Sequence, residues 1–195
     1  PTHTAWALWY HNPHDKSWGL NSYTKVCEFQ SIEEFWVLYN HWDTYLPKVF
    51  DGMYFLMRKL KNGNYIYPMW EDKYNKRGGF WSFKINKEEA IEVWNKLSIQ
   101  LVGEQISNDE KNIMTINGIS ISPKKNFCII KIWNSDFQLK KNDLIDRDLD
   151  FLDFDEVMYK CHNDNIVYDQ QKSKKPRVKH DGGGGNYRFS GRGRR

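Results

Sequence analysis

The chain has 195 residues and a mass of 23.4 kDa, which suits one domain with a proper core and leaves little room for two. With 39% hydrophobic and 28% charged residues and a mean hydropathy of -0.79, it has no run that approaches a membrane span and no secretory signal. We therefore expect a cytoplasmic protein that binds no membrane. The three cysteines form no Cys-x-x-Cys pair, which argues against a disulfide framework and a zinc site.

The formal net charge of +4 is divided unevenly. Residues 172–195 carry nine Lys or Arg against one Asp, so this segment has a net charge of +8 and residues 1–171 have a net charge of −4. We expect a folded domain over 1–171 and a flexible, basic Gly/Arg-rich tail over 172–195, because the tail has almost nothing apolar to bury. The tail can touch a polyanion or serve only as a solubilising segment, since nothing in it specifies a partner.

Short alternating runs of apolar and polar residues predict about eight strands. In the first run, 4–10, Trp6 and Leu8 fall on one side and Ala7 and Trp9 on the other, the period of a half-buried strand. Similar runs follow at 24–29, 52–59, 64–67, 79–85, 114–122, 127–133 and 156–160.

Two helix start signals lie between these runs. Ser31 and Asn86 are each followed three places later by a glutamate, as in a capping box, and the second segment continues with an apolar stripe to about residue 101. A third, Asp-rich helix is predicted over 143–153. Strands in hairpins with interspersed helices favour an α+β fold, in which the helices cover one face of the sheet and the other face stays open for a site.

Aromatic residues make up 16% of the chain, including nine tryptophans, more than one small core usually needs. The most informative pair is Trp70-Glu71, in a loop bracketed by Pro68 and Gly78-Gly79. An indole face stacks on a base, and a carboxylate accepts hydrogen bonds from the N1–H and N2–H₂ groups of guanine. Methylation of guanine at N7 makes the base cationic and adds a cation–π contribution. Trp18, in another loop, can complete a sandwich.

Several separated motifs together resemble the eukaryotic translation initiation factor 4E family in order and spacing over roughly residues 1–170. They are Trp6-Ala7-Leu8-Trp9, Asp15-Lys16-Ser17-Trp18, Glu34-Phe35-Trp36-x-Leu38-Tyr39-Asn40-His41, the run from Pro68 to Trp81, Trp94 and Ile132-Trp133. The resemblance implies a curved antiparallel sheet with about three helices on its convex face. It also implies a binding protein without enzymatic activity or cofactor, which grips the 7-methylguanosine cap of mRNA on the concave face.

By this resemblance, Trp18 and Trp70 are the two faces of the sandwich, Glu71 reads guanine, and Trp133 lies beside the N7-methyl group. The family places basic residues before the last cap tryptophan, but here Ile129 stands four residues before Trp133 and Phe80 replaces another basic residue. We assign the cap phosphates to Lys124 and Lys125, which we expect at a hairpin tip, with tail lysines as a further source of charge.

The resemblance also implies a partner helix on the convex face, from a scaffold factor 4G or a 4E-binding protein. The matching residues of this chain are Pro1, Ile32, Trp36, Ile99, Gly103 and Glu104, with Trp36 as the anchor. Lys96 stands where the family prefers an acid, so a basic partner peptide would be repelled. We expect a monomer.

Three alternatives remain open at this stage. The chain can be a cap-binding repressor of translation, although Trp at positions 6 and 18 favours the initiation type. Tryptophan platforms and paired carboxylates also occur in carbohydrate-active proteins. A general single-strand RNA binder driven by the tail would bind with steep salt dependence. His11 and His14 lack a third ligand, so we treat them as loop residues and expect no metal site.

Overall fold

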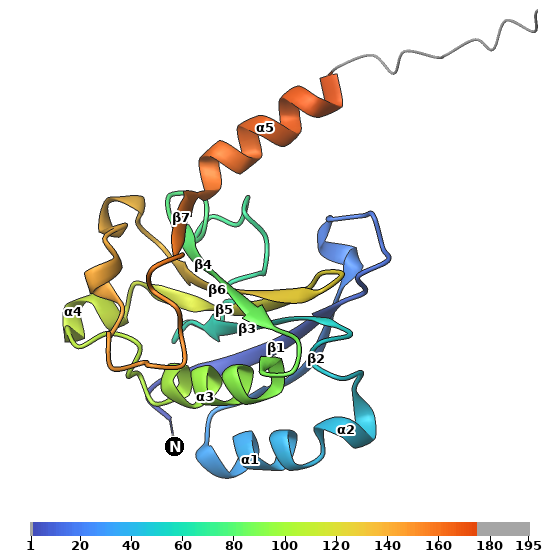
Figure 1. Cartoon of the computed structure of the whole chain (residues 1–195), viewed down its shortest axis with the longest axis vertical. Coiled ribbons are helices and arrows are strands. Elements are labelled where there is room, and N and C mark those ends of the chain that lie inside the picture. The colour runs from blue at the N-terminus through green and yellow to red at the C-terminus, as the bar shows by residue number, and fades with distance from the viewer. Residues whose placement is uncertain (1, 175–195) are drawn as a thin grey trace, which may run out of the picture.

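A seven-stranded antiparallel sheet forms the centre of the fold. The computed structural model describes residues 2–174 (Figure 1). The sheet contains β1 (Ala5–His11), β2 (Tyr23–Phe29), β3 (Met53–Lys59), β4 (Gly79–Asn86), β5 (Ile116–Pro123), β6 (Phe127–Asn134) and β7 (Met158–Cys161). The strand order is β2-β1-β3-β5-β6-β4-β7, and every neighbouring pair is antiparallel. The sheet is curved and does not close on itself, which confirms the predicted fold class.

The strand predicted over 64–67 is wrong. That segment makes only an isolated bridge between Tyr65 and Lys59. Its alternating aromatic residues have another cause: the rings of Tyr65 and Tyr67 pack against Trp9, with ring centroids 5.7 and 5.4 Å apart. The segment therefore covers one face of the sheet instead of extending it.

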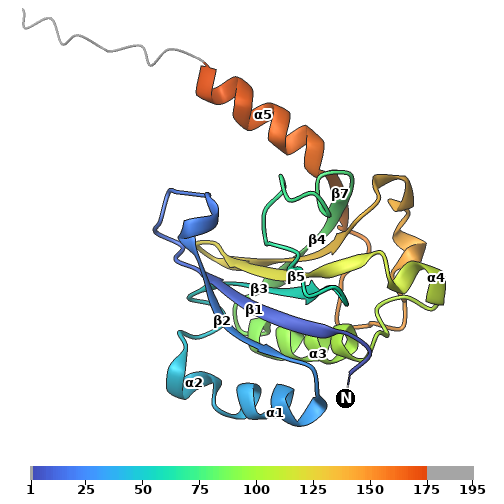
Figure 2. The same cartoon turned by 180° about the vertical axis from the view of Figure 1, so that it is seen from behind.

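The helices are α1 (Ile32–Asn40), α2 (Trp42–Tyr45), α3 (Ala90–Val102), α4 (Glu110–Ile113) and α5 (His162–Lys174). Helices α1 and α3 lie under one face of the sheet, whereas α5 leads away from the body at the β7 edge (Figures 1 and 2). The start of α1 agrees with the predicted cap, because the hydroxyl of Ser31 accepts a hydrogen bond from the Glu34 N–H at 3.1 Å. Helix α3 starts later than predicted, because Asn86 is still part of β4.

The helix predicted over 143–153 is absent. A short 3-10 turn at Asn142–Leu144 is followed by turns and bends. The Asp146 carboxylate accepts a hydrogen bond from the Asp148 N–H at 3.0 Å, and Asp153 does the same for Asp155 at 2.9 Å. Such local bonds give the backbone an alternative to the helical pattern, which is why the high Asp content of this segment opposes a helix.

Helix α5 was not predicted, and it crosses the boundary that we drew after residue 171. The position of that boundary stays a prediction. Residues 175–195, which include most of the predicted tail, lie outside the described residues, as does Pro1. None of the helices in the described part of the chain is both long and apolar enough to cross a membrane.

Two apolar clusters line the two faces of the sheet, and β1 contributes to both. Trp6 and Leu8 join the larger cluster, which includes α3 residues such as Trp94 and Leu97, so it fills the space between the sheet and its helices. Ala7 and Trp9 join a smaller cluster on the opposite, concave face. The aromatic residues on that face therefore border a surface that α1 and α3 do not cover (Figure 1).

Candidate functional site

A cavity of about 460 Å³ lies on the concave face. Its lining residues come from loops, from strands of the sheet and, with Asn165, from α5. The lining residues are Trp18, Tyr23, Met53, Phe55, Pro68, Met69, Trp70, Glu71, Phe80, Ser82, Ser122, Lys124, Ile129, Lys131, Trp133, Met158, Lys160 and Asn165. The structure thus brings Trp18, Trp70, Glu71, Trp133 and Lys124 together around one space, although they come from distant parts of the sequence.

Trp18 is held in the loop after β1 by a histidine. The two rings of His11 and Trp18 stack, with centroids 4.3 Å apart and planes inclined by 6°. We predicted that His11 is a loop residue, and this is wrong, because His11 is the last residue of β1. It is fully buried, and its Nε2 donates a hydrogen bond to the Ser17 carbonyl at 2.8 Å. Trp18 itself is 54% exposed, so one face of its indole rests on His11 while the side chain keeps a large accessible surface.

The loop that carries Trp70 and Glu71 is shaped by two buried asparagines. The Asn75 amide donates to the carbonyls of Tyr67 and Met69, both at 2.8 Å. The Asn117 amide in β5 donates in turn to the Asn75 side-chain oxygen at 2.8 Å. These bonds tie the loop to the sheet immediately before Trp70, so the loop is rigidly placed although it lies at the surface.

The loop returns to β4 at a point where only glycine fits. A Cβ atom on Gly78 would lie 1.8 Å from the Asn134 carbonyl oxygen. Glu71 is exposed, and within residues 2–174 its carboxylate has no hydrogen-bond or ion-pair partner, so its acceptor oxygens are available to a ligand. Burial, followed by the charge of Glu71, raises the pKa of Tyr23.

Trp133 forms part of the floor of the cavity. It is only 2% exposed, and its indole N–H donates to the Ser120 hydroxyl at 3.0 Å. The first residue of α5, His162, is fully buried against it with ring centroids 4.7 Å apart. Burial, with a contribution from Lys131, lowers the pKa of His162 to about 3, so this ring is neutral at physiological pH.

Three lysines line the wall near β6 and β7. Lys124 was predicted, whereas Lys131 and Lys160 were missed. Lys125 lies beside Lys124 at the tip of the β5–β6 hairpin, as expected, but is not among the lining residues. One of the two missed lysines had a signal in the sequence. Lys131 stands two residues before Trp133 and therefore lies on the same face of the strand.

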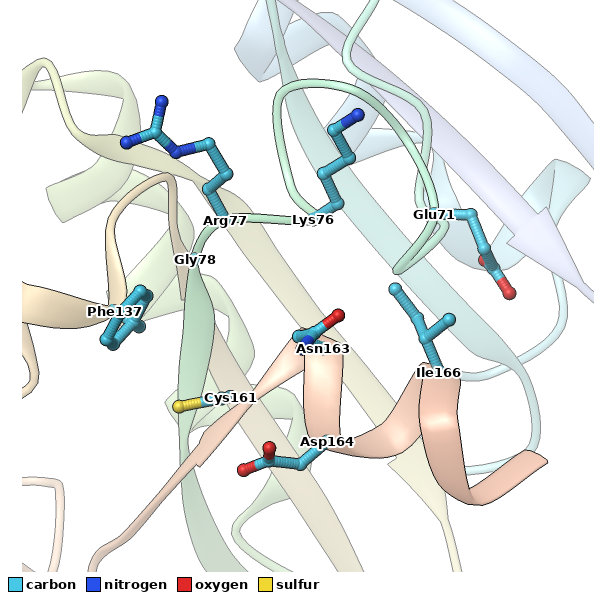
Figure 3. Close-up of a pocket in the computed structure, with 9 residues that line it drawn as sticks. All are labelled: Glu71, Lys76, Arg77, Gly78, Phe137, Cys161, Asn163, Asp164 and Ile166. Carbon is cyan, nitrogen blue, oxygen red and sulfur yellow. The ribbon is translucent and has the colours of Figure 1, made fainter. Parts of the chain in front are cut away.

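Glu71 also lines a second cavity, of about 640 Å³ (Figure 3). The first turns of α5 contribute Asn163, Asp164 and Ile166 to it, and the loop contributes Lys76 and Arg77. In Figure 3 the Glu71 carboxylate lies at the far side of this cavity from Arg77. Glu71 is thus a lining residue of both cavities.

The predicted partner residues lie on or near the helix-covered face. Ile32, Trp36 and Ile99 are between 42% and 45% exposed, and Gly103 is exposed. Glu104 differs, because its carboxylate is bound by the Arg58 guanidinium at 2.6 and 2.9 Å. Pro1 lies outside the described residues. Lys96 forms an ion pair with Glu92 at 2.7 Å, which partly neutralises the charge that we expected to repel a basic partner.

Among the described residues, no group of three or more His, Cys, Asp or Glu side chains is arranged to hold a metal ion. The cavity combines accessible indoles, a carboxylate without a partner in residues 2–174 and a wall of lysines, an arrangement that suits a flat ligand with hydrogen-bond donors and negative charge.

Comparison with known proteins then gives the family. The family model described as "Eukaryotic initiation factor 4E" matches residues 1–177, and this chain belongs to that family. Initiation factor 4E of Candida albicans is 32% identical over 143 residues, which is 70% of this chain and 65% of that protein. The chain thus spans slightly less than two thirds of the length of this curated relative.

Two solved structures have the same fold. The structure of C. elegans eIF4E-3 in complex with the 4E-binding protein Mextli and a cap analog has a TM-score of 0.69 at 25% identity, covering 91% of this chain and 97% of that chain. Ascaris suum eIF4E-3 in complex with the m7G cap has a TM-score of 0.68 at 26% identity, covering 83% and 91%.

Proposed function

We propose that this chain binds the 7-methylguanosine cap of mRNA and acts in translation initiation as a binding module without catalytic activity or cofactor. Trp18 and Trp70 sandwich the base, and Glu71 accepts hydrogen bonds from its N1–H and N2–H₂ groups. Trp133 lies beside the N7-methyl group. The observation that carries the proposal is the convergence of two accessible indoles and an unpartnered carboxylate on one cavity.

The binding free energies expected from the individual contacts favour a cationic base. Stacking contributes about 1–3 kcal/mol per base, and a desolvated cation–π contact about 2 kcal/mol. A bidentate base contact adds roughly 1–3 kcal/mol, and the entropic cost of binding offsets part of the sum. Recognition of the base alone therefore gives only a modest affinity. The lysines that line the cavity, with Lys124 and Lys125 at the hairpin tip, increase the affinity by binding the phosphates.

The partner surface is a second part of the proposal. Trp36 and Ile32 on α1 and Ile99 on α3 offer exposed apolar area on the convex face to the helix of a scaffold factor or a 4E-binding protein. Gly103, Pro1 and Glu104 complete the proposed surface. The C. elegans relative in complex with a 4E-binding protein supports this assignment. Substitution Trp36→Ala should weaken capture of such a helix and leave cap affinity unchanged.

The test of cap binding is a fluorescence titration of the full chain with 7-methyl-GTP and with GTP. We expect 7-methyl-GTP to quench tryptophan emission at micromolar concentration or below, because only the methylated base is cationic. GTP at the same concentration should leave the emission almost unchanged. Equal responses to the two nucleotides would contradict the proposal.

The same titration separates the alternatives. Quenching by an oligosaccharide would indicate a carbohydrate-binding protein. Binding of uncapped RNA with steep salt dependence and no preference for the cap would indicate a general RNA binder. A repressor binds the cap as an initiation factor does, so it differs only in its partner: it would bind the cap without recruiting a scaffold factor through Trp36.

A further inference from the structure

The register of the sheet arranges the concave side chains of β4, β6 and β7 in rows across the strands. Trp133 pairs with Phe80, and Phe80 pairs with Lys160, so these three form one row. In the next row Lys131 pairs with Ser82. Position 129, one row further out, holds isoleucine. The lysine on β6 is therefore only two residues from the tryptophan of the floor, a separation of about 7 Å along the strand.

The side chain of Lys131 leans toward the tryptophan row. Its ammonium group lies 4.3 Å from the centre of the Phe80 ring, and Phe80 belongs to the row of Trp133. Lys131 is partly buried and lines the cavity, and none of the ion pairs found in residues 2–174 involves it. Partial burial of an ammonium without a carboxylate is costly, and an anion in the cavity would offset that cost.

We propose that Lys131 binds the phosphate closest to the cap ribose, so that this first phosphate, rather than the terminal ones, dominates the phosphate contribution to affinity. The inference rests on the proposed cap-binding function and names the part of the ligand that this chain reads besides the base. Lys160, in the tryptophan row, assists at the same phosphate. Lys124, at the exposed hairpin tip, reaches only the outer phosphates or the RNA that follows.

The charges around Lys131 agree with this role. Strand β7 contributes Lys160, the hairpin tip contributes Lys124, and the His162 ring of α5 is neutral. In the row of Lys131, β4 contributes Ser82 and β5 contributes Ser120, and one row further out they contribute Lys84 and Ser122. Burial, reinforced by Lys124 and Lys160, lowers the pKa of Lys131 to about 8, and a bound phosphate raises it again because the two charges attract.

The test measures the affinity of the full chain for 7-methylguanosine and for its mono-, di- and triphosphates. We expect the largest gain between the nucleoside and the monophosphate. Lys131→Met keeps an apolar stem against Phe80 and should lower affinity for the monophosphate about tenfold or more, the effect of one charged hydrogen bond, while nucleoside affinity stays unchanged. The matched control is Lys111→Met, an exposed residue of α4 that does not line the cavity, and it should leave the affinity for the monophosphate unchanged.

Two results would overturn the inference while leaving the proposed function standing. In one, the wild-type chain prefers 7-methyl-GTP over GTP but gains little from the first phosphate. In the other, Lys131→Met weakens nucleoside and monophosphate by the same factor. Failure of the proposed function looks different, because the wild-type chain would then not distinguish 7-methyl-GTP from GTP at all.

A pH series gives an independent readout. Between pH 7 and pH 9 the wild-type chain should lose affinity for the monophosphate relative to Lys131→Arg, whose guanidinium stays charged over that range. The ligand's own titration is common to both proteins and cancels in the ratio. Parallel curves for the two proteins would contradict the inference.

Discussion

The two halves of the concave cavity are built by opposite means. In the half that holds Trp18 and Trp70, the side chains are supported: His11 stacks under one indole, and Asn75 ties the loop of the other to the sheet. In the half that holds the lysines, Lys131 lies near two other cations and has no carboxylate partner within residues 2–174.

This difference separates two ways of preparing a site for a ligand. The aromatic half is arranged before binding, so little ordering cost remains when a base enters. In the cationic half the lysine side chains repel one another, and the phosphates of a bound ligand would offset this repulsion. Substitution of His11 or Asn75 should therefore weaken the binding of every ligand with a methylated base. Substitution of the lysines should weaken the binding only of ligands that carry phosphates.

The largest effect is expected from Trp70→Ala. It removes one face of the sandwich, including the stack and its cation–π part, and should lower affinity for 7-methyl-GTP about a hundredfold. Isothermal titration calorimetry measures the loss, and circular dichroism checks that the variant is folded. Trp36→Ala, on the opposite face, is the control and should bind the cap normally. A folded Trp70→Ala variant with wild-type affinity would contradict the assignment of this tryptophan.

A smaller effect on binding, with a clear effect on stability, is expected from Asn75→Ala. The substitution removes three hydrogen bonds, to the carbonyls of Tyr67 and Met69 and from the buried Asn117 amide, at a cost of about 2–3 kcal/mol of unfolding free energy. Urea denaturation measures it. Cap affinity should fall about tenfold, because the loop must then be ordered on binding.

Asn126→Ala, in the exposed hairpin tip, should change neither quantity. If Asn75→Ala loses stability but keeps full cap affinity, then the buried asparagines do not position the base-binding loop.

The smallest effect is expected from His11→Ala. Without its stacking partner, Trp18 gains rotational freedom, and affinity should fall about threefold, the loss of one aromatic contact worth roughly 0.5–1.5 kcal/mol. His11→Phe should keep most of the affinity, since it retains a ring under the indole. His14→Ala, exposed in the same loop, should have no effect. A loss with His11→Phe as large as with His11→Ala would show that the hydrogen bond to Ser17, not the stack, supports Trp18.

Periodicity predicted most of the fold, because strands such as β1 alternate between two buried clusters and α1 begins at a side-chain cap. It failed where polar side chains bond to nearby backbone. The Asp-rich segment 143–153 has buried Leu149 and Leu152 at a helix-like spacing of three, yet its carboxylates hold turns. The segment 64–67 alternates because its tyrosines cover Trp9, a contact across the fold that no local pattern reveals.

The site was predictable to the extent that its residues stand in recognisable motifs. Trp18, Trp70, Glu71 and Trp133 were found in this way, and the structure places all four around one cavity. His11, Lys131 and Lys160 were missed because their positions at or next to the cavity depend on strand register and on the fold of the loop after β1. Lys160 reaches the cavity only because β7 pairs with β4, and His11 supports Trp18 only because the intervening loop folds back.

The most direct test of the central claim is the crystal structure of the complex with the 7-methylguanosine diphosphate. We predict that the purine lies parallel between the indoles of Trp18 and Trp70, with its N1–H and N2–H₂ edge on the Glu71 carboxylate and its first phosphate on Lys131. A purine bound elsewhere, or bound with only one indole in contact and its edge away from Glu71, would contradict the account.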